Sequence, residues 1–243
     1  MGNWQNQDVD GHGCDVFQPE RPSQYGYTII YLHDICLQGL TGRESFENAF
    51  EEHGLRVIVP HTSRSWWSDK ICVEFDHNRT AESYLLKSLV PWLAAHWEAI
   101  PPKIALLGIG MGGQGGLRFS FKYPDIFPIV AAITPAIDHQ CCWSDEESFL
   151  AQMYSNEEAI RQDTATLHIH PLYWPRNIWF CSHPTWIESA QRLNMKLSAL
   201  GIPHQANLEA KGQQTSGGYE EQMADSAVRF IVERLELERR RIQ

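Results

Sequence analysis

The sequence of 243 residues predicts an α/β fold with a mostly parallel central sheet, for two reasons. Short apolar runs, typical of strands buried on both faces, alternate with segments whose apolar residues recur at helical spacing. A glycine-rich turn joins one such strand to a helix in mid-chain. With 43% hydrophobic residues the chain can bury a large core, so we expect a single domain over residues 23–243, preceded by a polar, loosely docked arm over residues 1–22.

The predicted elements follow one another in regular alternation. Apolar runs that end in turn residues predict strands at 27–32, 55–59, 104–107, 129–133, 177–181 and 204–209. Helical periodicity predicts helices at 44–53, 80–96, 114–123, 190–200 and 226–241. An insertion at about 138–163 has acidic, helical character, and we expect it to form a small lid over the site.

Composition limits the classes of partner and compartment. A net charge of −10 argues against nucleic acid and against an anionic membrane surface as partners. The sequence contains no run of 18 apolar residues, so we expect no spanning helix. The polar start lacks the pattern of a secretory signal, and the six cysteines are scattered, so we expect a reducing, cytoplasmic location. The pair Cys141-Cys142 lacks zinc-site spacing, and we predict neither metal nor cofactor.

The turn at 108–113 admits three interpretations. Gly108-x-Gly110-x-x-Gly113 fits the dinucleotide-binding pattern literally, but it lies after two earlier strands, and Asp125 stands in a turn. A second interpretation is a glycine-rich turn without chemistry. The third is a nucleophile elbow, G-x-S-x-G, in which a serine sits between strand and helix. The strand, turn and helix favour the elbow, although Gly110 occupies the serine position.

Several motifs together resemble a known family. The stretch 108–116 and the stretch 122–125 are similar to the putative-esterase branch of the α/β-hydrolases, which includes esterase D (S-formylglutathione hydrolase) and feruloyl-esterase-like proteins. The similarity covers most of residues 25–235. It implies an α/β-hydrolase fold and a triad in which serine attacks an ester carbonyl, histidine accepts the proton and an acid orients the histidine. Further matching stretches are Leu32-His33, Ser65-Trp66-Trp67, residues 193–204, Met223-Ala224 and Arg229-Phe230.

Transferred to this chain, the triad finds none of its three side chains. The resemblance places the nucleophile at Gly110, which has no side chain. Spacing back from Met223 places the histidine at Thr215. The acid falls at about Thr185, in a loop over residues 182–186 that contains no carboxylate.

The predicted pocket follows the strand ends, where sites lie in parallel sheets. The resemblance assigns the oxyanion hole to the backbone near Met111 and Asp34. Asp34 stands where the family usually has glycine, and its carboxylate would oppose an oxyanion. The other pocket residues that we predict are His33, Cys36, His61, Trp66, Trp67 and Trp186.

These substitutions predict a protein without catalysis. Loss of one triad member typically costs about 10⁴ to 10⁶ in rate, and here three positions have changed. The interpretation that we favour is a pseudoenzyme that binds a small acyl or aromatic ligand or a protein partner. The alternative is a carboxylic-ester hydrolase that acts through a displaced nucleophile, for which Cys36, Ser182 and Ser216 are candidates.

Overall fold

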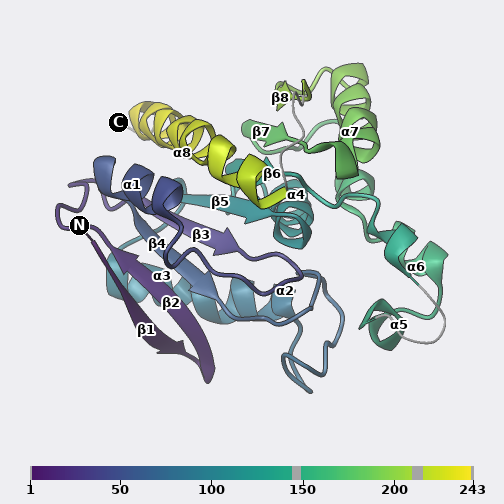
Figure 1. Ribbon diagram of the computed structural model, residues 1–243, viewed down its shortest axis with the longest axis horizontal. Coiled ribbons are helices and arrows are strands. Elements are labelled where there is room, and N and C mark those ends of the chain that lie inside the picture. The colour runs from purple at the N-terminus through teal and green to yellow at the C-terminus, as the bar shows by residue number, and fades with distance from the viewer. Residues whose placement is uncertain (1, 144–148, 210–215, 242–243) are drawn as a thin grey trace.

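The computed structural model describes residues 2–143, 149–209 and 216–241 (Figure 1). Strands and helices alternate along most of this chain, as the sequence predicts. The strands are β1 (Asn3–Val9), β2 (His12–Gln18), β3 (Thr28–Leu32), β4 (Arg56–Pro60), β5 (Ile104–Ile109), β6 (Ile129–Ile133), β7 (Asn177–Cys181) and β8 (Gln205–Asn207). The helices are α1 (Glu44–Glu52), α2 (Ala81–Tyr84), η1 (Leu85–Leu89), α3 (Val90–Trp97), α4 (Met111–Lys122), η2 (His139–Cys142), α5 (Phe149–Met153), α6 (Glu157–Arg161), η3 (Ala165–His168), η4 (Pro184–Trp186), α7 (Ile187–Ala199) and α8 (Ser216–Arg241).

The central sheet contains eight strands in the order β1-β2-β4-β3-β5-β6-β7-β8. Pairing is parallel from β4 through β8, whereas β2 runs antiparallel to both β1 and β4. Every residue of β3, β5, β6 and β7 is buried, which explains why these strands appear in the sequence as continuous apolar runs.

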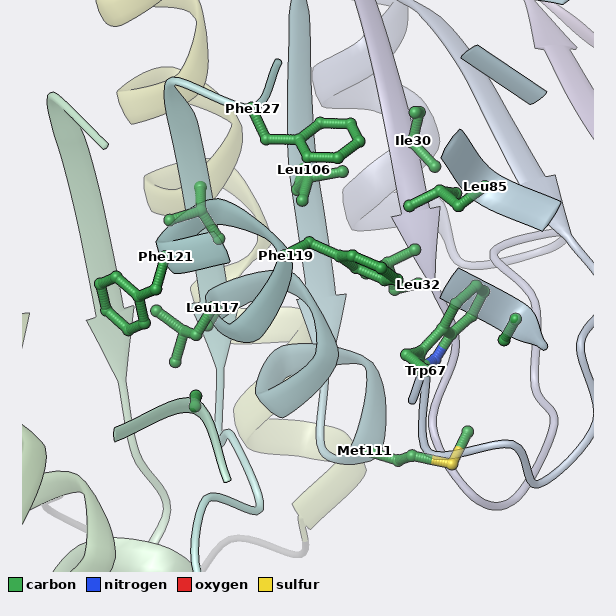
Figure 2. Close-up of a cluster of buried hydrophobic side chains, with 14 of the residues drawn as sticks. Ile30, Leu32, Trp67, Leu85, Leu106, Met111, Leu117, Phe119, Phe121 and Phe127 are labelled. Carbon is green, nitrogen blue, oxygen red and sulfur yellow. The ribbon is translucent and has the colours of Figure 1, made fainter. Parts of the chain in front are cut away.

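Helices cover both faces of the sheet. One buried cluster joins α1 and α8 to one face, and a second joins α4, α7 and the α2–α3 region to the other. Figure 2 shows part of the second cluster, in which Met111, Leu117 and Phe119 from α4 meet side chains from β3, β5 and η1. The carboxyl ends of the parallel strands therefore meet at one edge, at the start of α4.

The expectation of a loosely docked arm over residues 1–22 is wrong for most of that segment. Residues 3–18 form a hairpin that extends the sheet, with Cys14 of β2 opposite Pro60 of β4. Val16 and Phe17 are buried and provide the apolar face that fixes the hairpin. The sequence did not predict β1, because most of its residues are polar and only Val9 is buried.

Two predicted helices differ from the observed ones. The segment 80–96 is interrupted by a π-helical turn, η1, which ends at Leu89, two residues before Pro91. Proline lacks the N–H that would continue the α-helical ladder, and a widened turn accommodates this loss. The last helix begins at Ser216 rather than Ser226. Gly217 and Gly218 suggest a loop, but ion pairs from Arg43 to the first turns of α8 stabilise the helix there.

Smaller differences concern the edge and the insertion. The last strand, β8, spans three exposed residues, shorter than the predicted 204–209. The insertion contains the short helices η2, α5 and α6 and continues into η3. No helix within the described residues is both long and apolar enough to cross a membrane.

Candidate functional site

The turn after β5 has the geometry of an elbow. Gly110 adopts φ 54° and ψ −114°, a conformation that favours glycine. Its N–H donates to the Ile133 carbonyl at 3.1 Å, and its own carbonyl accepts the N–H groups of Gln114 and Ala136. A Cβ at Gly112 would overlap the Leu32 carbonyl, so glycine there allows α4 to approach β3 closely. The sequence therefore folds into a tight turn in which both backbone polar groups of Gly110 are hydrogen-bonded.

The side chain of Asp34 fills the space above this turn. Leu32 of β3 is paired with Gly108 of β5. Asp34 and Gly110 each lie two residues after this pair. Oδ1 of Asp34 accepts the Met111 N–H at 2.7 Å. A methyl group built on Gly110 would overlap Oδ1 and Cγ of Asp34 and lie 2.8 Å from Oδ2. The carboxylate thus occupies the place where a nucleophile's side chain would begin.

A buried histidine fixes the backbone of Asp34. His33 donates from Nδ1 to the Asp34 carbonyl at 3.0 Å, while its Nε2 accepts the Thr62 N–H at 3.3 Å. Burial lowers the pKa of His33 to about 4, so the ring is neutral at pH 7. The indole N–H of Trp67 donates to the His33 carbonyl at 3.1 Å. His33 and Trp67 are therefore supports beneath the site, not groups that face a ligand.

A cavity of about 180 Å³ opens beside the carboxylate. Arg43 lines it and donates to Glu221 at 2.5 Å and to Glu220 at 3.1 Å. Cys36, one of the expected pocket residues, is exposed and lines this cavity. Sequence reasoning missed the five other lining residues, because their positions carry no motif. The cavity is lined by Tyr31, Asp34, Cys36, Gln38, Arg43, Ile109 and Glu220.

Two other predicted pocket residues do not line this cavity. Trp66 is buried and stacks on His139 of η2, with ring centroids 4.5 Å apart. His61 pairs with Asp15 of β2 at 3.0 Å. Within the part of the chain that the structure describes, no three His, Cys, Asp or Glu side chains are grouped as a metal site requires.

Thr185 and Trp186 lie in a different cavity, of about 460 Å³. The Thr185 hydroxyl donates to Nδ1 of His183 at 2.9 Å, and the same nitrogen accepts the Thr185 N–H at 3.4 Å. His183 therefore caps η4. Thr215 lies outside the described residues, so the structure does not place it. This second cavity is lined by Asp138, Gln140, Cys141, Pro184, Thr185, Trp186, Ile187, Glu188, Ser189 and Arg192.

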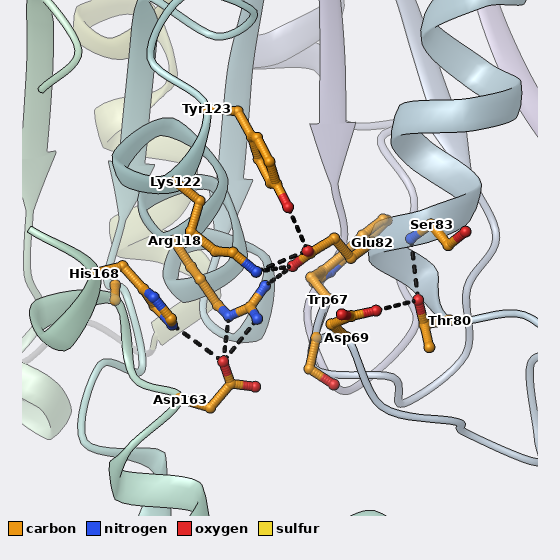
Figure 3. A network of polar contacts seen from close by, with 12 residues as sticks. Trp67, Asp69, Thr80, Glu82, Ser83, Arg118, Lys122, Tyr123, Asp163 and His168 are labelled. Carbon is orange, nitrogen blue, oxygen red and sulfur yellow. Dashed lines mark hydrogen bonds and ion pairs between the residues drawn. The ribbon is translucent and has the colours of Figure 1, made fainter. Parts of the chain in front are cut away.

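A buried ionic network anchors the insertion to the elbow helix (Figure 3). Arg118 of α4 is fully buried and bridges Glu82 of α2 and Asp163 of the insertion. Burial raises the pKa of Asp163, but hydrogen bonds from His168 and Tyr154 and the charge of Arg118 outweigh it and hold the pKa well below its usual range. The network thus fixes the insertion relative to α4.

Comparison with known sequences identifies relatives of this chain. The family model described as Putative esterase matches residues 12–224. S-formylglutathione hydrolase from Mus musculus is 24% identical over 147 residues, which cover 53% of this chain and 52% of the mouse protein. The chain therefore matches about half the length of that curated relative.

Solved structures share the fold over nearly the whole chain. A ferulic acid esterase superposes with a TM-score of 0.74 at 11% identity, covering 96% of this chain and 98% of the esterase. An S-formylglutathione hydrolase from Agrobacterium tumefaciens gives a TM-score of 0.72 at 14% identity, covering 96% and 94%. The predicted α/β-hydrolase fold is confirmed. Together with the match over residues 12–224, these findings show that the chain belongs to the Putative esterase family of α/β-hydrolases.

Proposed function

We propose that this chain is a non-catalytic member of its family that uses the cleft at its strand ends for binding. The observation that supports this proposal most is the Asp34 carboxylate, which accepts the Met111 N–H above Gly110. Ester cleavage requires such an N–H for the developing oxyanion, and a negative charge beside it opposes that charge. The proposed partners are a small acyl or aromatic ligand, with its carbonyl away from the elbow, or a protein.

The surroundings of the described hydroxyl groups also support the proposal. Among the described residues, two hydroxyl groups lie within hydrogen-bond distance of an imidazole nitrogen. The Thr62 hydroxyl, 3.5 Å from Nε2 of His33, is fully buried and cannot meet a substrate. Thr185 belongs to the η4 cap and to the cavity that does not include Asp34. Neither pair has an elbow or an oxyanion donor beside it.

The test of catalysis is direct. The chain is incubated with p-nitrophenyl acetate and, separately, with a fluorophosphonate probe. We expect turnover equal to that of buffer and no stoichiometric labelling. Labelling of one serine per chain together with turnover well above buffer would contradict the proposal. Activity that disappears in Cys36→Ala would instead assign the displaced nucleophile to this exposed thiol.

A single reversion tests the assignment of the other triad positions. Gly110→Ser supplies a hydroxyl, but the assigned base position, Thr215, carries no imidazole. We therefore expect Gly110→Ser to remain without esterase activity. Burst kinetics from this variant would show that a base is present and that the histidine position was assigned wrongly.

A further inference from the structure

Two adjacent cysteines, Cys141 and Cys142, end the short helix η2. Both residues are exposed. Side chains of consecutive residues on a helix point in different directions, yet these two thiols lie close enough to hydrogen-bond to each other. The fold therefore brings together two sulfur atoms that the sequence only places in succession, and it does so outside the turn that Asp34 and Gly110 share.

The two thiols differ in their surroundings. Cys141 lines the second cavity, of about 460 Å³, together with Thr185, Trp186 and Arg192. Partial burial, and then the neighbouring Cys141 side chain, raises the pKa of the Cys142 thiol to about 11. Because the thiolate is the reactive form, Cys142 is a poor target for an external reagent. Cys141 thus borders a space that admits a small molecule, whereas Cys142 is placed to react second.

The two ends of η2 are held differently. At its start His139 is buried, stacks on Trp66 and hydrogen-bonds through Nδ1 to the Ile137 carbonyl at 3.3 Å. At the other end Oε1 of Gln140 and Nε1 of Trp143 are buried and have no hydrogen-bond partner among the described residues. A rearrangement around the two cysteines therefore breaks no hydrogen bond of these two atoms.

We propose that Cys141 and Cys142 form a redox modification site, which a small organic disulfide reversibly oxidises to a vicinal disulfide. The Cys141 thiolate attacks one sulfur of the reagent and breaks its S–S bond, so that one half leaves as a thiol and the other half stays on Cys141 as a mixed disulfide. Cys142 then loses its proton and attacks the Cys141 sulfur, which forms the Cys141–Cys142 bond and releases the second half as a thiol. Two electrons and two protons pass from the protein to the reagent.

The vicinal bond is expected to be easy to reduce. Consecutive Cα atoms lie about 3.8 Å apart, whereas disulfide-bonded cysteines usually have Cα atoms about 4.4 to 6.8 Å apart. Strained disulfides have higher reduction potentials and are the labile ones. Closure therefore strains η2 and changes the lining of the second cavity, to which Cys141 belongs. This inference goes beyond the proposed function and holds whether or not the chain cleaves esters.

Oxidation of the full chain tests the inference. The chain is incubated with hydroxyethyl disulfide, at a concentration that fully converts a peptide with one cysteine, and is then quenched with acid and mapped by mass spectrometry. We expect the peptide that contains Cys141 and Cys142 to lose two hydrogen atoms, and reduced dithiothreitol to restore them. Cys36 is exposed and has no cysteine beside it in the sequence, so it should stop at the mixed disulfide and serves as the internal control. A pair that keeps its two hydrogen atoms, or that carries two mixed disulfides, overturns the inference.

Two conservative variants separate the roles of the thiols. Cys142→Ser should accumulate the mixed disulfide on Cys141, because no second thiol resolves it. Cys141→Ser should form its mixed disulfide on Cys142 roughly ten-fold more slowly, since the raised pKa makes the Cys142 thiolate scarce. In the urea-unfolded chain the two rates should become equal. Equal rates in the folded chain would contradict the assigned order of attack, and a vicinal bond that resists reduced dithiothreitol would contradict its reversibility.

Discussion

Gly110 and Asp34 divide one volume between them. The glycine leaves space at the elbow, and the carboxylate from the neighbouring strand end fills that space and satisfies the Met111 N–H. The sequence shows an aspartate where the resemblance expects glycine and a glycine where it expects serine. Both positions lie just after a pair of residues on adjacent parallel strands. The two departures from the family pattern, taken together, could therefore have indicated that Asp34 contacts Gly110.

The shared volume predicts a strong coupling between the two positions. Gly110→Ala places a methyl group in the volume of the Asp34 carboxylate, which must move away from the Met111 N–H. The variant also strains the backbone, because Gly110 has a positive φ. We expect it to lower the free energy of unfolding by roughly 2 to 4 kcal/mol, measured by urea denaturation. In an Asp34→Gly background, the loss of unfolding free energy caused by Gly110→Ala should be smaller by at least about 1 kcal/mol. Additive effects would contradict the shared volume.

A buried histidine gives the molecule a predicted sensitivity to acid. Burial lowers the pKa of His139 to about 4, against about 6.5 in an unfolded chain. Between these values the unfolded state binds more protons, so stability falls as the pH drops from 6.5 to 4. The contribution of His139 to this loss is on the order of 3 kcal/mol. In His139→Gln the midpoint of urea unfolding should decline less between pH 7 and 4.5.

The control for this pH dependence is His77→Gln. His77 is exposed, so its replacement should leave the acid-induced decline unchanged. Equal declines in the unaltered chain and in His139→Gln would show that the buried ring does not titrate in this range.

At the scale of elements, the elbow helix α4 connects the site to the insertion. Its amino end binds the Asp34 carboxylate, and further along Arg118 binds Glu82 and Asp163. Lys122 and Tyr123, near its carboxyl end, donate to the same Glu82 carboxylate at 2.7 and 2.6 Å (Figure 3). Since these groups are largely desolvated, removal of one leaves the charge of its partner uncompensated.

Glu82→Gln should therefore destabilise the chain severely. The change leaves Arg118 and Lys122 with one fewer opposite charge in a buried setting, at a cost on the order of 3 kcal/mol in the free energy of unfolding. The matched control is Asp225→Asn, which breaks an exposed pair with Arg229 on α8 and should cost about 0.5 kcal/mol. Similar midpoints of chemical denaturation for both variants would show that the buried network contributes no more to stability than the exposed pair.

Sequence reasoning succeeded for elements with a continuous apolar signal and failed where tertiary contacts decided the outcome. The strands β6 and β7 have the predicted bounds because all their residues are buried. The first ten residues of α8 were missed because a Gly-Gly pair indicates a loop, whereas contacts with Arg43 stabilise a helix. The assignment of the site residues stays a prediction. The structure adds the direction of the Asp34 side chain, which points to the Met111 N–H and which no local pattern encodes.

At the scale of the whole molecule, the hairpin of β1 and β2 completes the sheet. β2 covers the edge of β4, and its buried residues Cys14, Val16 and Phe17 join both core clusters. Figure 1 shows this hairpin at the opposite side of the sheet from β7 and β8. The chain thus distributes its core contacts over the entire sheet, and the amino-terminal segment is part of the fold.

Truncation tests the contribution of this hairpin. A chain that begins at Ser23 exposes the edge of β4 and loses Val16 and Phe17, each worth roughly 1.5 to 3 kcal/mol of burial. Against a typical total stability of about 5 to 15 kcal/mol, we expect it to unfold or aggregate. A chain that begins at Gly11 removes only β1, in which Val9 is the one fully buried residue, and should retain cooperative unfolding. Equal melting temperatures for the Ser23 chain and the full chain would mean that the first 22 residues are a loosely docked arm after all.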